Sequence, residues 1–211
     1  MKPLPAPVRF DRDTAERAIR EYNAGSYRGC SNVALDRAAY DCFAAGLADD
    51  GAGMIELVRF VGEDYGGAQR RFLPHGYREE AALIVARLVP VLGRWRQLVA
   101  DAKLLLDAVP DETTVRELFA PFAGTKRWPV WCSKTLHFLR PDAFPILDSL
   151  AKNALGLAGL DGTPRNYRRF CEAFRATLLA NQDVLAAARS IDAGASPSDI
   201  KLLDKILYQI G

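Results

Sequence analysis

The sequence predicts an all-α protein that folds as a single compact bundle of about seven to nine helices. Apolar residues recur at helical spacing in most segments. Hydroxyl, acidic and proline residues stand where several of these segments begin. No internal repeat, low-complexity tract or interdomain linker divides the 211 residues. We therefore expect residues 1–211 to form one helical domain, with residues 1–10 as a proline-rich N-terminal lead-in.

The composition is typical of a globular protein with a substantial core, since 49% of the residues are apolar and 26% are charged. The formal net charge of +2 is too small to indicate a partner. The start of the chain is interrupted by prolines and lacks the apolar stretch of a signal peptide. No apolar run approaches the roughly 20 residues that a membrane span needs. We expect a cytoplasmic protein that makes no membrane contact.

The four cysteines are not spaced as in a CxxC metal motif. Only two histidines are available as imidazole ligands. We therefore expect no metal and no cofactor. We expect the thiols to be reduced and buried as small apolar side chains. The cysteines are Cys30, Cys42, Cys132 and Cys171.

The first part of the chain is expected to begin with two helices. Asp11 or Asp13 can cap the first helix, and the second is expected to start at Ser31 after a loop marked by two glycines. Residues 54–61 are apolar, and so short a run fits a strand or a helix. Residues 62–76 contain several glycines and a proline, which predicts a loop.

The rest of the chain carries clearer helix signals. Residues 78–109 form a long helical pattern, in which Pro90 is expected to cause a kink or a break. Asp111 is placed to cap a shorter helix. A helix opens at Thr163-Pro164, and the last helix is expected to start within residues 196–199.

Residues 129–149 differ from the rest of the chain because they combine aromatic residues with a lysine, a histidine and an aspartate. On a helix over about residues 131–139, Lys134 lies between two aromatic rings. If such a lysine is buried, its pKa falls and its amine can become a nucleophile. Asp148 precedes the next apolar helical pattern and is therefore placed as the N-cap of that helix.

This segment resembles part of the helix-hairpin-helix DNA glycosylases. That family carries a Pro-Gly-Val-Gly-x-Lys-Thr hairpin, followed by Pro-Val-Asp at the start of a later helix. Residues 129–135 align with the hairpin without a gap, which places Lys134 on the family's lysine and Asp148 on its catalytic aspartate. The resemblance implies cleavage of an N-glycosidic bond. Lys134 would attack the sugar carbon, and Asp148 would stabilise the cationic transition state.

The two hairpin glycines are replaced by Val130 and Cys132 in this chain. Because a glycine lets the backbone approach a DNA phosphate, side chains at these positions would obstruct that contact. The alternative is a structural role, in which Asp148 only caps its helix and Lys134 pairs with an acid. A pocket that binds a ligand without reacting with it is a third interpretation.

A second resemblance covers a longer pattern. The sequence Ser-Lys-x-Leu-His-Phe, continued by Pro-x-x-Phe-Pro-Ile-x-Asp-Ser, is similar to uncharacterised bacterial helical proteins. The ending over residues 203–208 is similar to the same proteins. This likeness indicates a family and implies no activity.

The helix predicted to open at the Thr-Pro pair carries a row of arginines opposite its apolar face. A guanidinium group can donate two parallel hydrogen bonds to the oxygens of one phosphate. We therefore expect Arg165, Arg168 and Arg169 to contact DNA or another phosphate-bearing ligand. We expect Ser133 and His137 to add to these substrate or phosphate contacts. A solvated helix face is the alternative for the arginines. A hydrogen-bonded structural histidine is the alternative for His137.

Three functional hypotheses follow from these patterns. The first is a helical protein that binds nucleic acid or another phosphate-bearing ligand. The second is a glycosylase-like enzyme that uses Lys134 and Asp148. The third is a protein-interaction module without chemistry. The sequence leaves the oligomeric state undetermined.

Overall fold

The computed structural model describes residues 3–27, 29–48, 52–63, 65, 77–125 and 128–211, and it confirms the all-α prediction. Within these ranges, β structure is limited to a short antiparallel ladder between residues 26–27 and 30–31. The sequence marked this segment only as a loop. No helix in the described ranges combines the length and the apolar character that crossing a bilayer requires.

The helices outnumber the seven to nine that we expected, because the long pattern is divided and one helix was not predicted at all. The elements are α1 (Arg12–Ala24), β1 (Ser26–Tyr27), β2 (Cys30–Ser31), α2 (Asn32–Ala48), α3 (Ala52–Glu63), α4 (Tyr77–Leu88), the 3-10 helix η1 (Val89–Val91), α5 (Leu92–Ala100), α6 (Glu112–Phe119), the 3-10 helix η2 (Ala120–Phe122), α7 (Trp128–Leu139), α8 (Ser149–Ala154), α9 (Pro164–Ala180), α10 (Gln182–Asp192) and α11 (Asp199–Ile210).

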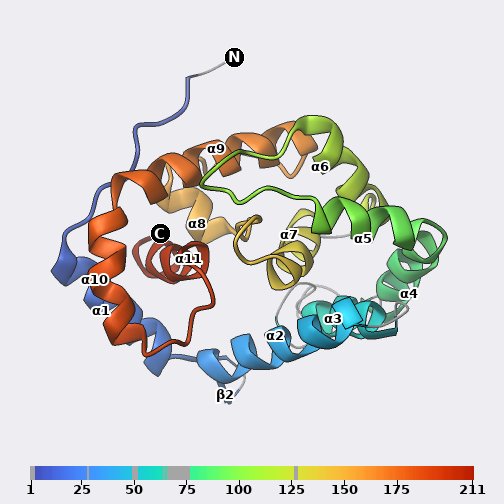
Figure 1. Cartoon of the computed structure of the whole chain (residues 1–211), viewed down its shortest axis with the longest axis horizontal. Coiled ribbons are helices and arrows are strands. Elements are labelled where there is room, and N and C mark those ends of the chain that lie inside the picture. The colour runs from blue at the N-terminus through green and yellow to red at the C-terminus, as the bar shows by residue number, and fades with distance from the viewer. Residues whose placement is uncertain (1–2, 28, 49–51, 64, 66–76, 126–127) are drawn as a thin grey trace.

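Helices α7 and α11 lie in the interior, with other helices arranged around them (Figure 1). Every residue of α11 from Ile200 to Leu207 is buried. In α7, every residue from Trp131 to Leu139 is buried except Lys134. A helix that is buried all round needs neighbours on every side. The core therefore forms around two central helices, and the polar side chains that these helices carry are enclosed.

Side-chain caps fix the starts of several helices, as the sequence predicted. Asp11, Asp111 and Thr163 each accept a hydrogen bond from the backbone N–H three residues further on. These bonds satisfy backbone donors that have no partner within the first turn of a helix. The last helix begins at the end of the predicted range, because Ser198 rather than Ser196 caps α11.

The helical region predicted over residues 78–109 is shorter than expected. Pro90 breaks it as predicted, since this residue lies in η1 between α4 and α5. Helix α5 ends at Ala100 rather than near Val109. The guanidinium of Arg140 donates to three carbonyl oxygens at and just after this end, at 2.7 to 3.3 Å. A side chain distant in the sequence thus binds the carbonyls that a longer helix would have used.

Helix α10 was missed because it begins at Gln182, one residue after the end of α9, and the side chain of its N-cap residue Asn181 makes no capping hydrogen bond. Residues 54–61, which fitted a strand or a helix, belong to α3. The loop predicted over residues 62–76 starts inside α3. Residues 64 and 66–76 of that loop lie outside the described residues.

The cysteines follow the sequence prediction in part. Cys132 and Cys171 are free and buried, as expected. Cys30 is exposed, because it belongs to the short β ladder at the surface. The side chain of Cys42 lies outside the described residues. A buried role for all four thiols was therefore wrong for Cys30.

The contact between α3 and α7 predicts the effect of one added methyl group. A Cβ at Gly62 would lie 2.3 Å from Cζ2 of Trp131, whose fully buried ring is held by a 2.8 Å bond from Nε1 to the carbonyl of Val58. We expect Gly62→Ala to lower the free energy of unfolding by about 1–3 kcal/mol through overpacking. Gly93→Ala, where no atom lies within 4 Å of the added Cβ, should raise it by about 0.5–1 kcal/mol. Urea denaturation measures both changes, and shifts of the same sign would contradict this packing.

Candidate functional site

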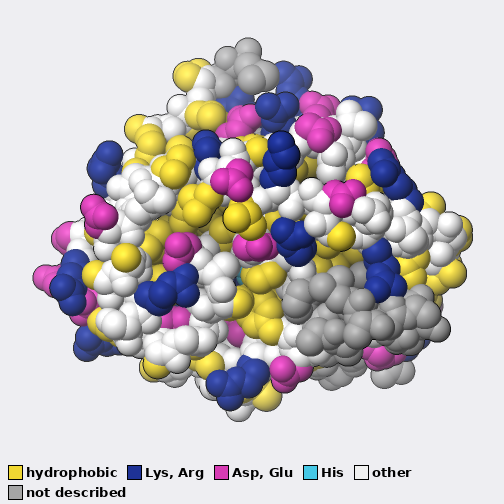
Figure 2. Space-filling view, in the orientation of Figure 1, with side chains coloured by type: hydrophobic (Ala, Val, Ile, Leu, Met, Phe, Trp, Pro, Cys, Tyr) yellow, Lys and Arg dark blue, Asp and Glu magenta, His cyan; other side chains and the backbone are white. Residues whose placement is uncertain are grey.

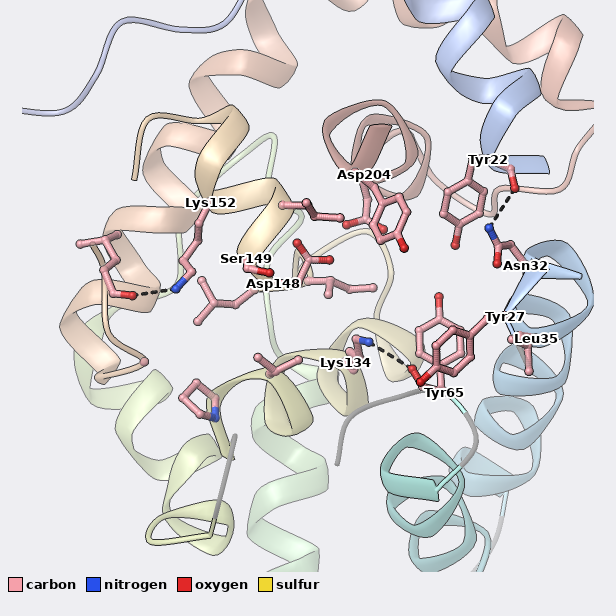
Figure 3. A pocket seen from close by; sticks show the side chains of 18 of the residues that line it. Tyr22, Tyr27, Asn32, Leu35, Tyr65, Lys134, Asp148, Ser149, Lys152 and Asp204 are labelled. Atoms are coloured by element: carbon pink, nitrogen blue, oxygen red, sulfur yellow. Dashed lines mark hydrogen bonds between the residues drawn. The ribbon is translucent and has the colours of Figure 1, made fainter. Parts of the chain in front are cut away.

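A pocket of about 400 Å³ opens between α1, α2, α7, α8 and α11 (Figure 3). Both residues that the sequence singled out for chemistry, Lys134 and Asp148, line this pocket. Asp204 of α11 projects into the same hollow. Aromatic and polar side chains complete the wall, among them Tyr22, Tyr27, Asn32, Tyr65 and Tyr208.

The segment that presents Asp148 is an extended connector, residues 144–147, held by three buried side chains. Nδ1 of His137 lies 2.8 Å from the carbonyl oxygen of Phe144. The hydroxyl of Tyr167 donates to the carbonyl of Pro145 at 2.9 Å. The hydroxyl oxygen of Ser133 accepts from the N–H of Leu147 at 3.0 Å. Because buried backbone groups need hydrogen-bond partners, these bonds fix the path of the connector and hence the position of Asp148.

Asp148 caps α8 and also lines the pocket. Its Oδ1 accepts from the N–H of Ala151 at 2.7 Å, which confirms that it caps α8. Burial raises the pKa of Asp148, and the negative charge of Asp204 raises it further. The Ala151 N–H and the ammonium of Lys134 oppose this rise. The carboxyl group is therefore fixed by a helix terminus and shares the pocket with a second acid.

Lys134 is half-buried and lies beside Tyr65. Its Nζ donates to the backbone carbonyl of Tyr65 at 3.1 Å and lies 4.8 Å from the centroid of the Tyr65 ring. Burial lowers the pKa of Lys134, although Asp148 and Asp204 raise it in part. Among the carboxylates that the structure describes, none forms an ion pair with Lys134. At a given pH, a larger fraction of the Lys134 amine is therefore unprotonated than in a lysine exposed to water.

A buried ionic cluster lies behind the pocket. Nζ of Lys201 is 3.2 Å from Oδ1 of Asp36 and 3.1 Å from Oδ2 of Asp204, and Lys201 and Asp36 are each only 1% exposed. Lys201 also donates to the hydroxyls of Tyr22 and Tyr65, each at 3.2 Å. Burial alone would lower the pKa of Lys201, but Asp36 and the surrounding acidic groups raise it well above its usual value. Lys201 therefore stays charged.

The same helix carries a second buried pair. Nζ of Lys205 lies 2.6 Å from Oδ1 of Asp192 and donates to Oδ1 of Asn23 at 3.0 Å. This pair links α11 to α10 and α1. It does not line the pocket, so its role is to join the helices.

The structure places Ser133 and His137 behind the pocket wall. Both are fully buried, and neither lines the pocket. Nε2 of His137 lies 2.9 Å from the hydroxyl of Tyr40, so both ring nitrogens have partners. Burial lowers the pKa of His137 to about 3. His137 is therefore neutral at physiological pH and holds the connector, and Ser133 has the same positioning role.

The arginine row lies on α9, and none of its members lines the pocket. Arg168 pairs with Glu172 at 3.2 Å, and Arg169 donates to the carbonyl of Pro3 at 3.1 Å. Arg165 is exposed. On the face shown in Figure 2, basic side chains are interspersed with acidic ones. The structure therefore does not bring Arg165, Arg168 and Arg169 together with Lys134.

The sequence did not single out three residues of the site, Asp36, Lys201 and Asp204. A signal for Asp204 was present, because it shares a helix face with Ile200 and Leu207 in an apolar pattern. In the described part of the chain, no group of three or more His, Cys, Asp or Glu side chains is arranged to hold a metal ion.

Comparison of the chain with protein-family models, with curated proteins and with solved structures found no match. The likeness to helix-hairpin-helix glycosylases and to bacterial helical proteins therefore stays a prediction.

The Lys201 cluster gives a prediction for stability. Lys201→Met leaves Asp36 and Asp204 buried without their cation, so we expect the free energy of unfolding to fall by about 3–5 kcal/mol. Arg189→Met removes a surface pair with Asp199 and should cost at most about 1 kcal/mol. Chemical denaturation of both variants measures the difference. Equal losses would mean that the Lys201 cluster is not buried as described.

His137 gives a prediction for pH dependence. Its folded pKa of about 3 lies below the usual 6.5, so the unfolded state binds the proton first as the pH falls. We therefore expect wild-type stability to fall between pH 6.5 and 5, with a slope of at most about 1.4 kcal/mol per pH unit from this group. His137→Gln should be less stable at pH 7 but show a flatter profile in that window. Denaturation at several pH values tests this, and an unchanged slope in the variant would contradict it.

Proposed function

We propose that this chain is an enzyme that cleaves N-glycosidic bonds, with Lys134 as the nucleophile and Asp148 as the carboxylate that stabilises the cationic sugar. One observation carries the proposal: an amine on α7 and a carboxylate at the start of α8 line the same pocket. The lowered pKa of Lys134 supports nucleophilic attack, because only the neutral amine has a free electron pair. The resemblance of residues 129–148 to helix-hairpin-helix glycosylases supports the same roles.

The reaction begins at C1′ of the sugar. The electron pair of the Lys134 amine forms a bond to C1′ while the bond from C1′ to the base breaks, and that bonding pair leaves with the base. Positive charge develops on the sugar ring, and the carboxylate of Asp148 stabilises it. The proton that the amine loses passes to the ring oxygen O4′ as the bond from C1′ to O4′ breaks, which leaves an imine at C1′ and a hydroxyl at C4′. Water then hydrolyses the imine, which frees the Lys134 amine and releases the sugar aldehyde.

The substrate class is a nucleoside unit, either within DNA or free. A volume of about 400 Å³ lies in the range of small-ligand sites. Aromatic rings stack on bases of any sequence, and four tyrosines line the pocket: Tyr22, Tyr27, Tyr65 and Tyr208. A nucleotide in duplex DNA would have to leave the base stack to enter.

The DNA form of the proposal keeps Arg165, Arg168 and Arg169 as phosphate contacts at a distance from the pocket. We infer a cytoplasmic location, to which the free buried thiols of Cys132 and Cys171 are suited. The alternative is a non-catalytic interaction module, and negative results in the following experiments would favour it.

Trapping with sodium borohydride tests the nucleophile. The Lys134 amine should condense with the C1′ aldehyde of an abasic site, with loss of water, and borohydride should reduce the resulting imine to a stable amine. We expect wild-type protein to become covalently joined to an abasic-site oligonucleotide or to free deoxyribose, and Lys134→Ala to lose this product. Lys152→Ala is the matched control, because Lys152 also faces this region but donates to the carbonyl of Leu160 at 2.8 Å.

Trapping of the oligonucleotide alone would place the substrate in DNA. Trapping of deoxyribose with equal efficiency would favour free nucleosides. Absence of both products, or equal trapping by Lys134→Ala, would contradict the proposed function.

Replacement of Asp148 separates catalysis from helix capping. Asparagine is also a favourable N-cap, so Asp148→Asn should keep the wild-type stability, whereas Asp148→Ala should lose about 0.5–2 kcal/mol. Both variants should release guanine from guanosine, or from a guanine-containing oligonucleotide, about 100-fold more slowly than wild type. Chromatography of the released base and thermal unfolding give the two readouts. Normal base release by Asp148→Asn would limit this residue to capping.

A further inference from the structure

Asp204 differs from the other buried carboxylates that the structure describes. It is 4% exposed and lies on α11, with its Oδ2 accepting from Lys201 at 3.1 Å. Among the described residues, its Oδ1 has no hydrogen-bond partner. By contrast, both carboxylate oxygens of Asp36 have partners, in Lys201 and in the hydroxyls of Tyr22 and Tyr65. Oδ1 is itself covered from solvent, but Asp204 lines the pocket, so a ligand bound there can supply the missing partner.

The charges around the pocket do not balance. The cluster contains three carboxyl groups, Asp36, Asp148 and Asp204, and two lysines, Lys134 and Lys201. Lys152 and Asp161 also line the pocket, and their opposite charges cancel in this count. One carboxyl group is in excess when both lysines are charged. Buried carboxylates without a cation bind a proton instead. We therefore expect at least one of these three aspartates to carry a proton.

The position of each carboxyl group indicates which one holds the proton. Asp36 accepts from a lysine and two tyrosine hydroxyls, and Asp148 accepts from a backbone N–H at a helix N-terminus. Asp36 and Asp148 are thus each held by hydrogen-bond donors, although burial and the charge of Asp204 raise the pKa of Asp148. In Asp204, Oδ1 has no hydrogen-bond partner within the described ranges. Asp204 also lies within α11 rather than at its start, so no backbone N–H of a first helical turn is available to it. The charged and titratable groups that act on it from the surrounding elements are Tyr22, Asp36, Tyr40, Lys134, Asp148, Lys201 and Tyr208.

We propose that Asp204 is the general acid of this pocket and that its Oδ1 delivers a proton to the base as the base leaves. This inference rests on the proposed function. In the step above, the departing base carries the electron pair of the broken C1′–N bond. The proton of Asp204 combines with that pair, which leaves a neutral base and the Asp204 carboxylate. Lys201, already 3.1 Å from Oδ2, stabilises the carboxylate that forms.

A change of leaving group tests this role. Guanine leaves guanosine as an anion unless it is protonated, whereas 7-methylguanosine carries a positive base that leaves as a neutral molecule. We expect Asp204→Asn to release guanine from guanosine about 100-fold more slowly than wild type or worse, as expected for loss of a general acid. Release of 7-methylguanine should change by less than about threefold on the same principle. The same pair of bases within an oligonucleotide serves for a DNA substrate.

Two variants provide the comparison. Asp148→Asn should slow both substrates, because both pass through a cationic sugar. Asp183→Asn, an exposed acid in the first turn of α10, should slow neither. If Asp204→Asn slows both substrates equally, or slows neither, Asp204 is not the acid.

Borohydride trapping separates this inference from the proposed function. Attack on an abasic site expels no base, so Asp204→Asn should be trapped as efficiently as wild type. Normal trapping with an equal loss on the two nucleosides would reject Asp204 as the acid and leave Lys134 as the nucleophile. A wild-type protein that is neither trapped nor releases base would overturn both proposals.

A measurement without substrate examines the proton directly. Carbon-13 NMR of protein labelled at the aspartate carboxyl carbons should show one carboxyl signal in the protonated position at pH 7. That signal should disappear in Asp204→Asn and persist in Asp183→Asn. Carboxyl signals that are all in the ionised position at pH 7 would overturn the assignment, whether or not the variants remain active.

Discussion

Lys201 lies in the interior at 3.1 to 3.2 Å from carboxylates on α2 and α11 and from a tyrosine hydroxyl on α1. An ammonium group in such surroundings is costly unless its partners stay in place, because removal of one leaves a charge without water or a counterion. The three helices therefore cannot separate without exposing or unpairing this charge. Since the same helices form one side of the pocket, the cluster also fixes the shape of the candidate site.

The opposite side of the pocket depends on a different requirement. Residues 144–147 form no helix and no ladder, so their buried backbone groups take partners from side chains of α7 and α9. His137, Ser133 and Tyr167 provide these partners. The bonds that satisfy the connector thus also determine where Asp148 stands. This explains why a serine and a histidine that resemble site residues in sequence lie one layer behind the pocket.

The sequence predicted those features that local rules determine. The caps at Asp11, Asp111, Asp148 and Thr163 follow from bonds within four residues, and Lys134 attracted attention through its aromatic neighbours on one helix. Helix α5 ends where Arg140 binds its carbonyls, a contact that no local pattern records. Lys201 was missed for the same kind of reason. On a helix taken as one-sided, a lysine is expected in solvent, and only the burial of α11 on all sides turns it inward.

Asp204 carries a buried carboxylate oxygen that the described part of the fold leaves without a partner. A buried carboxylate oxygen without a partner costs about 1–3 kcal/mol, and a core that served stability alone would have no use for it. Asp36, bound to the same lysine, shows that this fold can satisfy a buried carboxylate fully. The difference between the two residues is their position, because Asp204 lines the pocket and Asp36 does not. Sites that retain unsatisfied polar groups are commonly functional, since a ligand supplies the missing partner. The cost at Asp204 is thus best explained by a ligand atom that accepts a proton from it.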